Sequence, residues 1–200
     1  LLATPALIYY YINDFYLIKY SVGIVGPEIK FNIFNKVIII LSLALFYYLP
    51  FINKKNLKNT FNVLKNFKNE IFLITFSLLS IYFFNFPYGN FGGGIFLHIS
   101  QFIIKNNLIL FIVFIFSIFT FKASKLMNFN NVLLFVCLVL YNLQVSIYHK
   151  YFDPLLLFIF LFLTSNLKIN NQKFFLEITK KFYLLYLVFL SISFLKIIIL

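Results

Sequence analysis

The sequence predicts an all-α, polytopic transmembrane helix bundle with about seven spans, and three observations lead to this fold class. Of the 200 residues, 62% are hydrophobic and only 11% are charged, too few to cover a water-soluble domain. The apolar residues form long runs without the alternation of barrel strands. Short lysine-bearing segments separate the runs, as is typical of loops beside membrane spans. This composition excludes a soluble enzyme, a disordered tail and a disulfide scaffold.

The apolar runs predict where the chain crosses the membrane. A crossing needs about 20 predominantly apolar residues. The predicted spans are residues 1–18, 37–52, 71–87, 107–121, 132–148, 154–165 and 182–200. The shorter spans are completed at the interface by flanking Tyr, Asn and Lys side chains. Pro154 suits the first turn of the sixth span, because its missing N–H would have no helical partner there. Residues 1–200 are therefore expected to form a single polytopic membrane domain.

The two ends of the sequence predict that it is a C-terminal fragment of a longer protein. The chain begins at Leu1, inside an apolar run and without an initiator Met, and it ends at Leu200 inside another run. A signal peptide would have a charged start and a small-residue cleavage site. We therefore expect the first run to be a membrane span whose beginning is missing.

The distribution of lysine predicts the orientation of the spans. Eleven lysines lie in the loops 53–70, 122–131 and 166–181, and five lie in the alternate loops. Because lysine-rich short loops stay in the cytoplasm, the alternate loops should face the periplasm or lumen. The expected location is the bacterial inner membrane or the endoplasmic reticulum. The net charge of +12 is assigned to these loops and to membrane lipids as partners, and no nucleic acid is expected to bind.

Residues 53–70 have the pattern of a helix that lies in the plane of the headgroups. Leu57, Phe61, Leu64 and Phe67 recur at helical spacing, while five lysines occupy other positions. We predict a cytoplasmic interfacial helix, with a substrate-binding role as the alternative.

The outer loop between residues 85 and 107 carries four glycines before a helical pattern resumes. Glycines such as Gly93 and Gly94 let backbone amides approach a ligand, and a helix that follows can bind phosphate. His98 and Gln101 come next, on one face of that helix. The loop lacks the features of a Walker loop or a dinucleotide fingerprint. It predicts phosphate or sugar binding, with a flexible connector as the alternative.

The third outer loop concentrates a base, a cation, a phenol and a carboxylate: His149, Lys150, Tyr151 and Asp153. Such groups are costly near hydrocarbon and tend to line a polar cavity. The alternatives are an aromatic belt for the tyrosine and a helix cap for the aspartate. Glu28 is the carboxylate of the first outer loop. Two histidines on separate loops fall short of a metal-ligand set, so neither a metal nor another cofactor is predicted.

The stretch from Gly94 to Gln101, GIFLHISQ, resembles the glycine, histidine and glutamine pattern of dolichol-dependent glucosyltransferases in the GT-C class. The resemblance covers about ten residues and the general layout of spans. It implies a membrane glycosyltransferase that takes a sugar from a polyprenyl or dolichyl phosphate carrier at the non-cytoplasmic face. Asp153 and Glu28 are then the candidate catalytic bases. Residues for donor binding are Gly93, Gly94, His98, Gln101, His149, Lys150 and Tyr151. The signature acid of that class lies in its first outer loop, which here would precede Leu1.

Two other classes of function remain open. A transporter or ion-translocating subunit needs ionisable groups at membrane depth, and five of the seven runs contain none; Asp14 and Lys196 are the exceptions. A structural subunit of a membrane complex needs no site at all. The lack of Trp and Arg beside abundant Phe, Ile, Lys and Asn is typical of an AT-rich genome, including those of organelles that encode such subunits.

Overall fold

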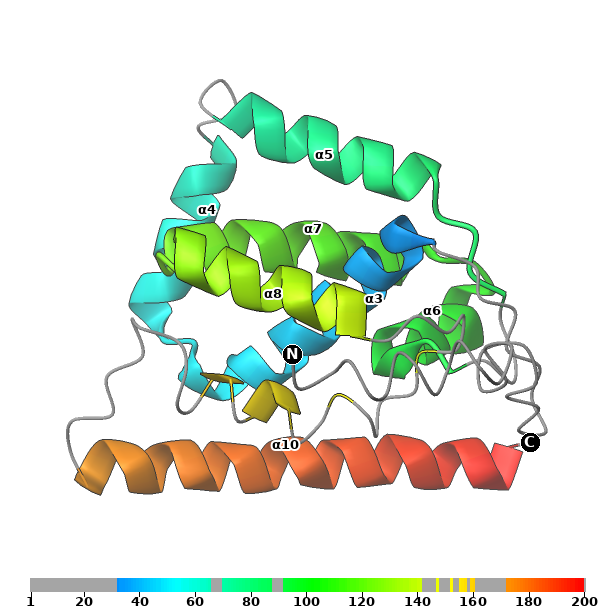
Figure 1. Ribbon diagram of the computed structural model, residues 1–200. Helices are drawn as coiled ribbons and strands as arrows, with labels where there is room; N and C mark the ends of the chain where they lie inside the picture. Colours follow the sequence, from blue (N-terminus) through cyan, green and yellow to red (C-terminus); the bar gives the residue numbers. More distant parts are fainter. Residues whose placement is uncertain are drawn as a thin grey trace, which may run out of the picture.

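The structure is a computed structural model, shown in Figure 1, that describes residues 32–65, 70–87, 92–141, 147, 152, 155–157, 159–160 and 172–199. The named elements in these ranges are all helical, which confirms the all-α class. They are α3 (Ile33–Tyr48), η1 (Leu49–Phe51), α4 (Lys54–Lys65), α5 (Ile71–Tyr82), α6 (Gly94–Ile104), α7 (Leu108–Ala123), α8 (Phe129–Tyr141) and α10 (Gln172–Ile199). The first predicted span, 1–18, and most of the sixth, 154–165, lie outside the described residues.

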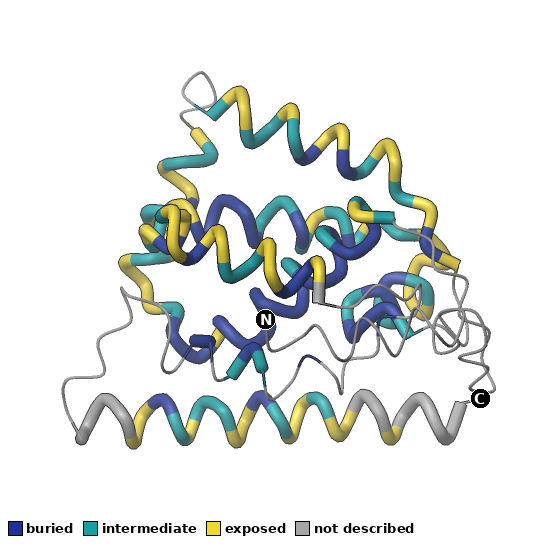
Figure 2. Tube along the Cα trace, viewed as in Figure 1, coloured by how far each residue is buried: buried dark blue, intermediate teal, exposed yellow. Residues whose placement is uncertain are grey.

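Helix α3 is the centre of the fold. Asn32 caps its first turn, because the Asn32 Oδ1 accepts a hydrogen bond from the backbone N–H of Asn35 at 3.2 Å. From Ile38 onward α3 is buried almost throughout, whereas the described turns of α5 and α10 carry exposed residues (Figure 2). Helices α5, α6, α7 and α8 all contact α3. An apolar helix that is surrounded by other helices is expected to be buried on every side.

The remaining helices are arranged along and across this centre. Helices α5, α7, α8 and α10 run roughly side by side, and α3 crosses obliquely between them (Figure 1). Helix α4 lies across one end of this bundle, and α6 lies at the opposite end (Figure 1). Asparagine caps begin two of these helices: Asn53 Oδ1 accepts from Asn56 N at 2.8 Å in α4, and Asn128 Oδ1 accepts from Asn131 N at 2.8 Å before α8.

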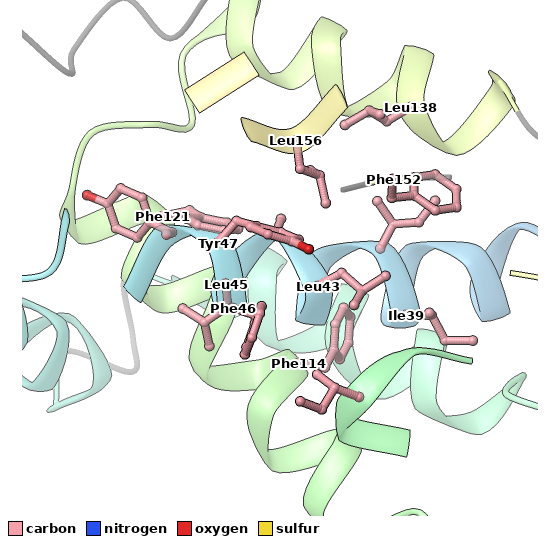
Figure 3. Packing of buried hydrophobic residues seen from close by; sticks show 14 of the residues in the cluster. Ile39, Leu43, Leu45, Phe46, Tyr47, Phe114, Phe121, Leu138, Phe152 and Leu156 are labelled. Atoms are coloured by element: carbon pink, nitrogen blue, oxygen red, sulfur yellow. The ribbon is translucent and has the colours of Figure 1, made fainter. Parts of the chain in front are cut away.

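The apolar core surrounds α3 on both sides. Phe114 of α7 lies on one side of α3, and Phe152 and Leu156 lie on the other (Figure 3). At the end of α3 nearer α4, the Tyr48 ring lies 5.6 Å from the ring centre of Phe121, at an edge-to-face angle. These contacts join α3 to residues far along the chain and position both ends of the bundle.

Among the described residues, one continuous helical segment, Ile33–Phe51, is long and apolar enough to cross a membrane by its length and composition. It covers the predicted span 37–52 except for its last residue, Ile52. Four further apolar helices, α5, α6, α7 and α8, are shorter. The described part of the chain thus contains one candidate span near its N-terminal end.

Helix boundaries differ from the predicted spans at two places. Helix α5 ends at Tyr82 rather than at residue 87, because Pro87 disfavours helical geometry before it and the Asn85 N–H donates to Asn35 Oδ1 at 2.8 Å. Helix α10 begins at Gln172, so residues 172–181, predicted to be loop, are helical. An ion pair between Lys181 Nζ and Glu177 Oε1 at 2.8 Å, one turn apart, supports this polar first part of α10.

Candidate functional site

A glycine turn leads the chain into α6. The φ angles of Gly92, Gly93 and Gly94 are 87°, 102° and 76°, all in the left-handed region that other residues rarely adopt. A Cβ on Gly94 would lie 3.0 Å from Cδ2 of Leu43 in α3. Glycine is therefore favoured at position 94 both by the backbone conformation and by the close approach to α3.

The glycine turn also pairs with the segment that leads to the third outer loop. The backbone N–H of Gly93 donates to the carbonyl oxygen of Ile147 at 2.8 Å, and Gly92 forms an isolated parallel bridge with Ile147. The Ile147 side chain is buried. The glycine turn and the segment at Ile147 thus lie side by side, although they are far apart in the sequence. Ile147 is two residues before His149. Because the Gly93 N–H is engaged in this pairing, an anion at the turn would need other donors.

His98 and Gln101 lie in the second and third turns of α6, as the helical pattern predicted. Both side chains are half-buried. The Nε2 of Gln101 donates to Oδ1 of Asn107 at 2.6 Å, so this side chain closes the end of α6 against the start of α7. The structure therefore assigns a structural contact to Gln101, and the binding role of Gln101 stays a prediction.

A hydroxyl completes the same corner between α6 and α7. Ser100 is fully buried; its Oγ donates to the carbonyl oxygen of Asn106 at 2.6 Å and accepts from the backbone N–H of Ile109 at 3.1 Å. Lys105 ends α6 in the left-handed region, with a φ of 55°. Sequence reasoning missed this corner, although the Asn-Asn pair after a helix is a recognisable turn signal.

The other predicted site residues cannot be compared with the structure. Glu28, His149, Lys150, Tyr151 and Asp153 lie outside the described residues. Phe152, between Tyr151 and Asp153, is fully buried in the apolar core, and the pairing of Gly93 with Ile147 lies two residues before His149.

A buried polar pair near the start of α3 was also missed. Asn35 and Lys36 are 5% and 4% exposed, and Asn35 holds the N–H of Asn85 from the loop after α5. Lys36 precedes the apolar run that begins at Val37, so the sequence predicted it to be one of the five lysines in the alternate loops. The signal that would have found both residues is Asn32, whose cap starts the helix before them.

Within the described ranges, no group of three His, Cys, Asp or Glu side chains could hold a metal ion. No family model, no curated protein and no solved structure matches this chain. The class that the described residues define is therefore an all-helical protein with one candidate membrane-spanning helix.

Proposed function

We propose that this chain is a multi-pass integral membrane protein with seven spans, on the strength of how apolar and polar side chains are distributed. Large apolar side chains point outward from the bundle, including Phe72 and Leu78 of α5, which are 80% and 61% exposed. Small hydroxyl residues are buried instead, such as Ser77 of α5 and Ser117 of α7. Lipid tails accept the first group, and small residues allow helices to approach each other in a membrane.

Four of the buried hydroxyls are satisfied within their own helices, whereas the buried Oγ1 of Thr120 has no hydrogen-bond partner among the described residues. Ser42, Ser77, Ser80 and Ser117 each donate to a carbonyl oxygen one turn earlier, at 2.6–2.8 Å. These polar groups therefore need no water inside the bundle.

Contacts between loops support the predicted alternation of spans. Lys122 Nζ lies 3.6 Å from Glu70 Oε2, and this ion pair joins two loops assigned to the cytoplasmic side. The hydrogen bonds from Asn85 to Asn35 and from Gly93 to Ile147 join segments near the opposite side. The helices α5, α7 and α8 contain 12, 16 and 13 residues, roughly 18–24 Å. Flanking residues and local thinning of the bilayer complete these crossings.

For activity, the proposal is sugar transfer from a polyprenyl phosphate carrier at the non-cytoplasmic end. The observation that carries it is the hydrogen bond between Gly93 and Ile147, which brings the glycine turn beside the segment before His149. In this proposal Lys150 and His149 compensate the charge of the donor phosphate, because the chain has no arginine for bidentate contact. Asp153 removes the proton from the acceptor hydroxyl, and Glu28 is the second candidate base.

The test is a transfer assay with purified full-length protein and a purified polyprenyl phosphate sugar. Lys150→Gln should raise the KM for the donor, and Asp153→Asn should lower kcat while the donor still binds. Lys58→Gln, at the opposite end of the bundle, is the matched control and should leave both constants unchanged. Unchanged transfer by the Lys150→Gln, Asp153→Asn double variant would remove this loop from the mechanism.

Lys36 favours a second candidate function, ion or solute translocation. A lysine that is 4% exposed on a central helix is the kind of ionisable group that marks translocation paths. If the protein is a transporter, Lys36→Gln should reduce solute flux into proteoliposomes, and wild-type protein should transfer no sugar. Sugar transfer by the wild type that survives Lys36→Gln would exclude this alternative.

A further inference from the structure

Helix α4 has one face packed on the bundle and one face left open. Thr60 is fully buried, its Oγ donates to the carbonyl oxygen of Asn56 at 2.9 Å, and α4 packs on α7. The exposed residues of α4 are Lys54, Lys55, Leu57, Lys58, Phe61, Asn62 and Lys65. We call five of them, which lie side by side on the helix, the lysine–phenylalanine face: Lys54, Leu57, Lys58, Phe61 and Lys65.

The basic and the apolar side chains of the lysine–phenylalanine face lie in two separate rows along α4. Lys54, Lys58 and Lys65 are separated by four and seven residues, so they form one row along the helix. Leu57 and Phe61 are also one turn apart and lie beside this row, toward the packed side. Phe61 is 55% exposed although it is a large aromatic residue. An apolar strip therefore borders directly on a basic row.

The charge of this face is not balanced from within the described part of the protein. Helix α4 contains no acidic residue. The two described carboxylates, Glu70 and Glu177, form ion pairs with Lys122 and Lys181 instead. The lysine–phenylalanine face thus suits an anionic partner that also offers an apolar layer.

The position of α4 indicates which partner has both properties. It lies across the end of the bundle rather than along it (Figure 1). If the bundle axis is normal to a bilayer, α4 lies in the plane of the headgroups, with the apolar strip at the acyl boundary.

We propose that the lysine–phenylalanine face binds anionic phospholipids of the cytoplasmic leaflet. Leu57 and Phe61 enter the boundary of the acyl chains, and the row of three lysines contacts the headgroup phosphates. This inference rests on the membrane placement proposed above and is independent of sugar transfer.

The absence of tryptophan from the sequence makes a direct test possible. Phe61→Trp introduces a single tryptophan, which can be excited selectively beside the tyrosines, into the full chain, and the protein is reconstituted in nanodiscs of phosphatidylcholine and phosphatidylglycerol. The bromine quencher is placed on the acyl chains of one lipid or of the other, at constant composition. We expect roughly twofold stronger quenching per brominated phosphatidylglycerol than per brominated phosphatidylcholine. Changing Lys54, Lys58 and Lys65 to Gln in the same protein should abolish this difference.

Two control positions separate the ways in which the proposal can fail. Leu78→Trp, on the outward side of α5, should be quenched by both lipids without preference. Asn62→Trp, which is exposed on α4 but lies on the far side of the lysine row, should be quenched more weakly than Phe61→Trp. Equal quenching of Phe61→Trp by both lipids, with Leu78→Trp quenched, would overturn the lipid preference alone. No quenching of Leu78→Trp would overturn the membrane placement and this proposal with it.

Discussion

At the scale of single residues, a few buried polar side chains hold the loops to the bundle. Asn35 is buried in α3, and its Oδ1 accepts from the backbone N–H of Asn85 at 2.8 Å. This contact replaces the helical hydrogen bond that Asn85 would make if α5 continued. A buried backbone N–H without an acceptor raises the free energy of the folded state. The side chain of Asn35 therefore stabilises the loop in which the chain leaves α5.

Asn35→Ala should lower the free energy of unfolding by about 1–3 kcal/mol, because it leaves the Asn85 N–H without its acceptor. Unfolding in SDS, followed by circular dichroism, measures this loss. Asn85→Ala is the matched control, since the hydrogen bond uses only the backbone of Asn85, and it should change stability by less than about 0.5 kcal/mol. Equal losses for both variants would contradict the assigned role of Asn35.

Gly94→Ala should destabilise the protein by about 1–2 kcal/mol, because an alanine at a φ of 76° is strained in the left-handed region. Its Cβ would also press on Leu43. The same unfolding titration in a Leu43→Ala background removes the contact but keeps the backbone strain. The effect of Gly94→Ala should then become smaller without vanishing; an unchanged stability in both backgrounds would show that glycine is not needed.

At the scale of elements, α6 and α7 form a hairpin that polar side chains close at its corner. Ser100 and Gln101 of α6 bind the Asn106-Asn107 turn, and Ser100 also accepts from the first turn of α7. Because the same helix begins at the glycine turn beside Ile147, the orientation of α6 depends on contacts at both of its ends. His98 lies between them and is positioned by both.

Ser100→Ala should cost about 1–3 kcal/mol, since the Ile109 N–H and the Asn106 carbonyl both lose a partner inside the bundle. The comparison variant is Ser191→Ala in α10, where the exposed hydroxyl donates to Leu187 O of its own helix at 2.9 Å. This second change should have an effect below about 0.5 kcal/mol. Thermal unfolding of both variants in detergent measures the difference, and similar melting temperatures would exclude a special role for the corner.

At the scale of the whole molecule, polarity is distributed as in a protein that is surrounded by lipid. Large apolar residues cover the outward sides of α5, α8 and α10, while several serines, such as Ser77, Ser80 and Ser117, are buried. The basic helix α4 occupies one end, and the glycine turn occupies the other (Figure 1). This distribution gives each end of the bundle a different chemistry.

Labelling of the single cysteine, Cys137, tests this arrangement in the protein without a substitution. Cys137 is exposed on α8, among apolar residues that we assign to the lipid. A membrane-impermeant maleimide should not label it in intact vesicles, because the polar reagent does not enter the hydrocarbon layer, but it should label it after SDS is added. Lys58→Cys in a Cys137→Ala background should react in intact vesicles that expose the cytoplasmic side. Rapid labelling of Cys137 in the native protein would mean that α8 faces water.

The features of this protein that could be predicted from the order of its residues are local. Apolar runs predicted the helical class, and asparagine caps such as Asn32 and Asn53 mark helix starts through contacts three residues away. The glycine-rich segment before α6 was likewise visible in the sequence, because glycine adopts positive φ angles more readily than other residues. The start of α10 was missed, since its first turns are polar and resemble a loop.

The hydrogen bonds between residues that are far apart in the sequence could be identified only from the three-dimensional structure. Nothing near Gly93 indicates that its N–H binds Ile147, and nothing near Asn35 indicates Asn85 as its partner. The contact of Gln101 with Asn107 likewise depends on how tightly the chain turns after α6. Helical periodicity limits which residues share a face, but it does not specify the face of another helix that covers them. That choice follows from packing the whole chain around α3, which brings buried polar groups such as Asn35 to partners far along the chain.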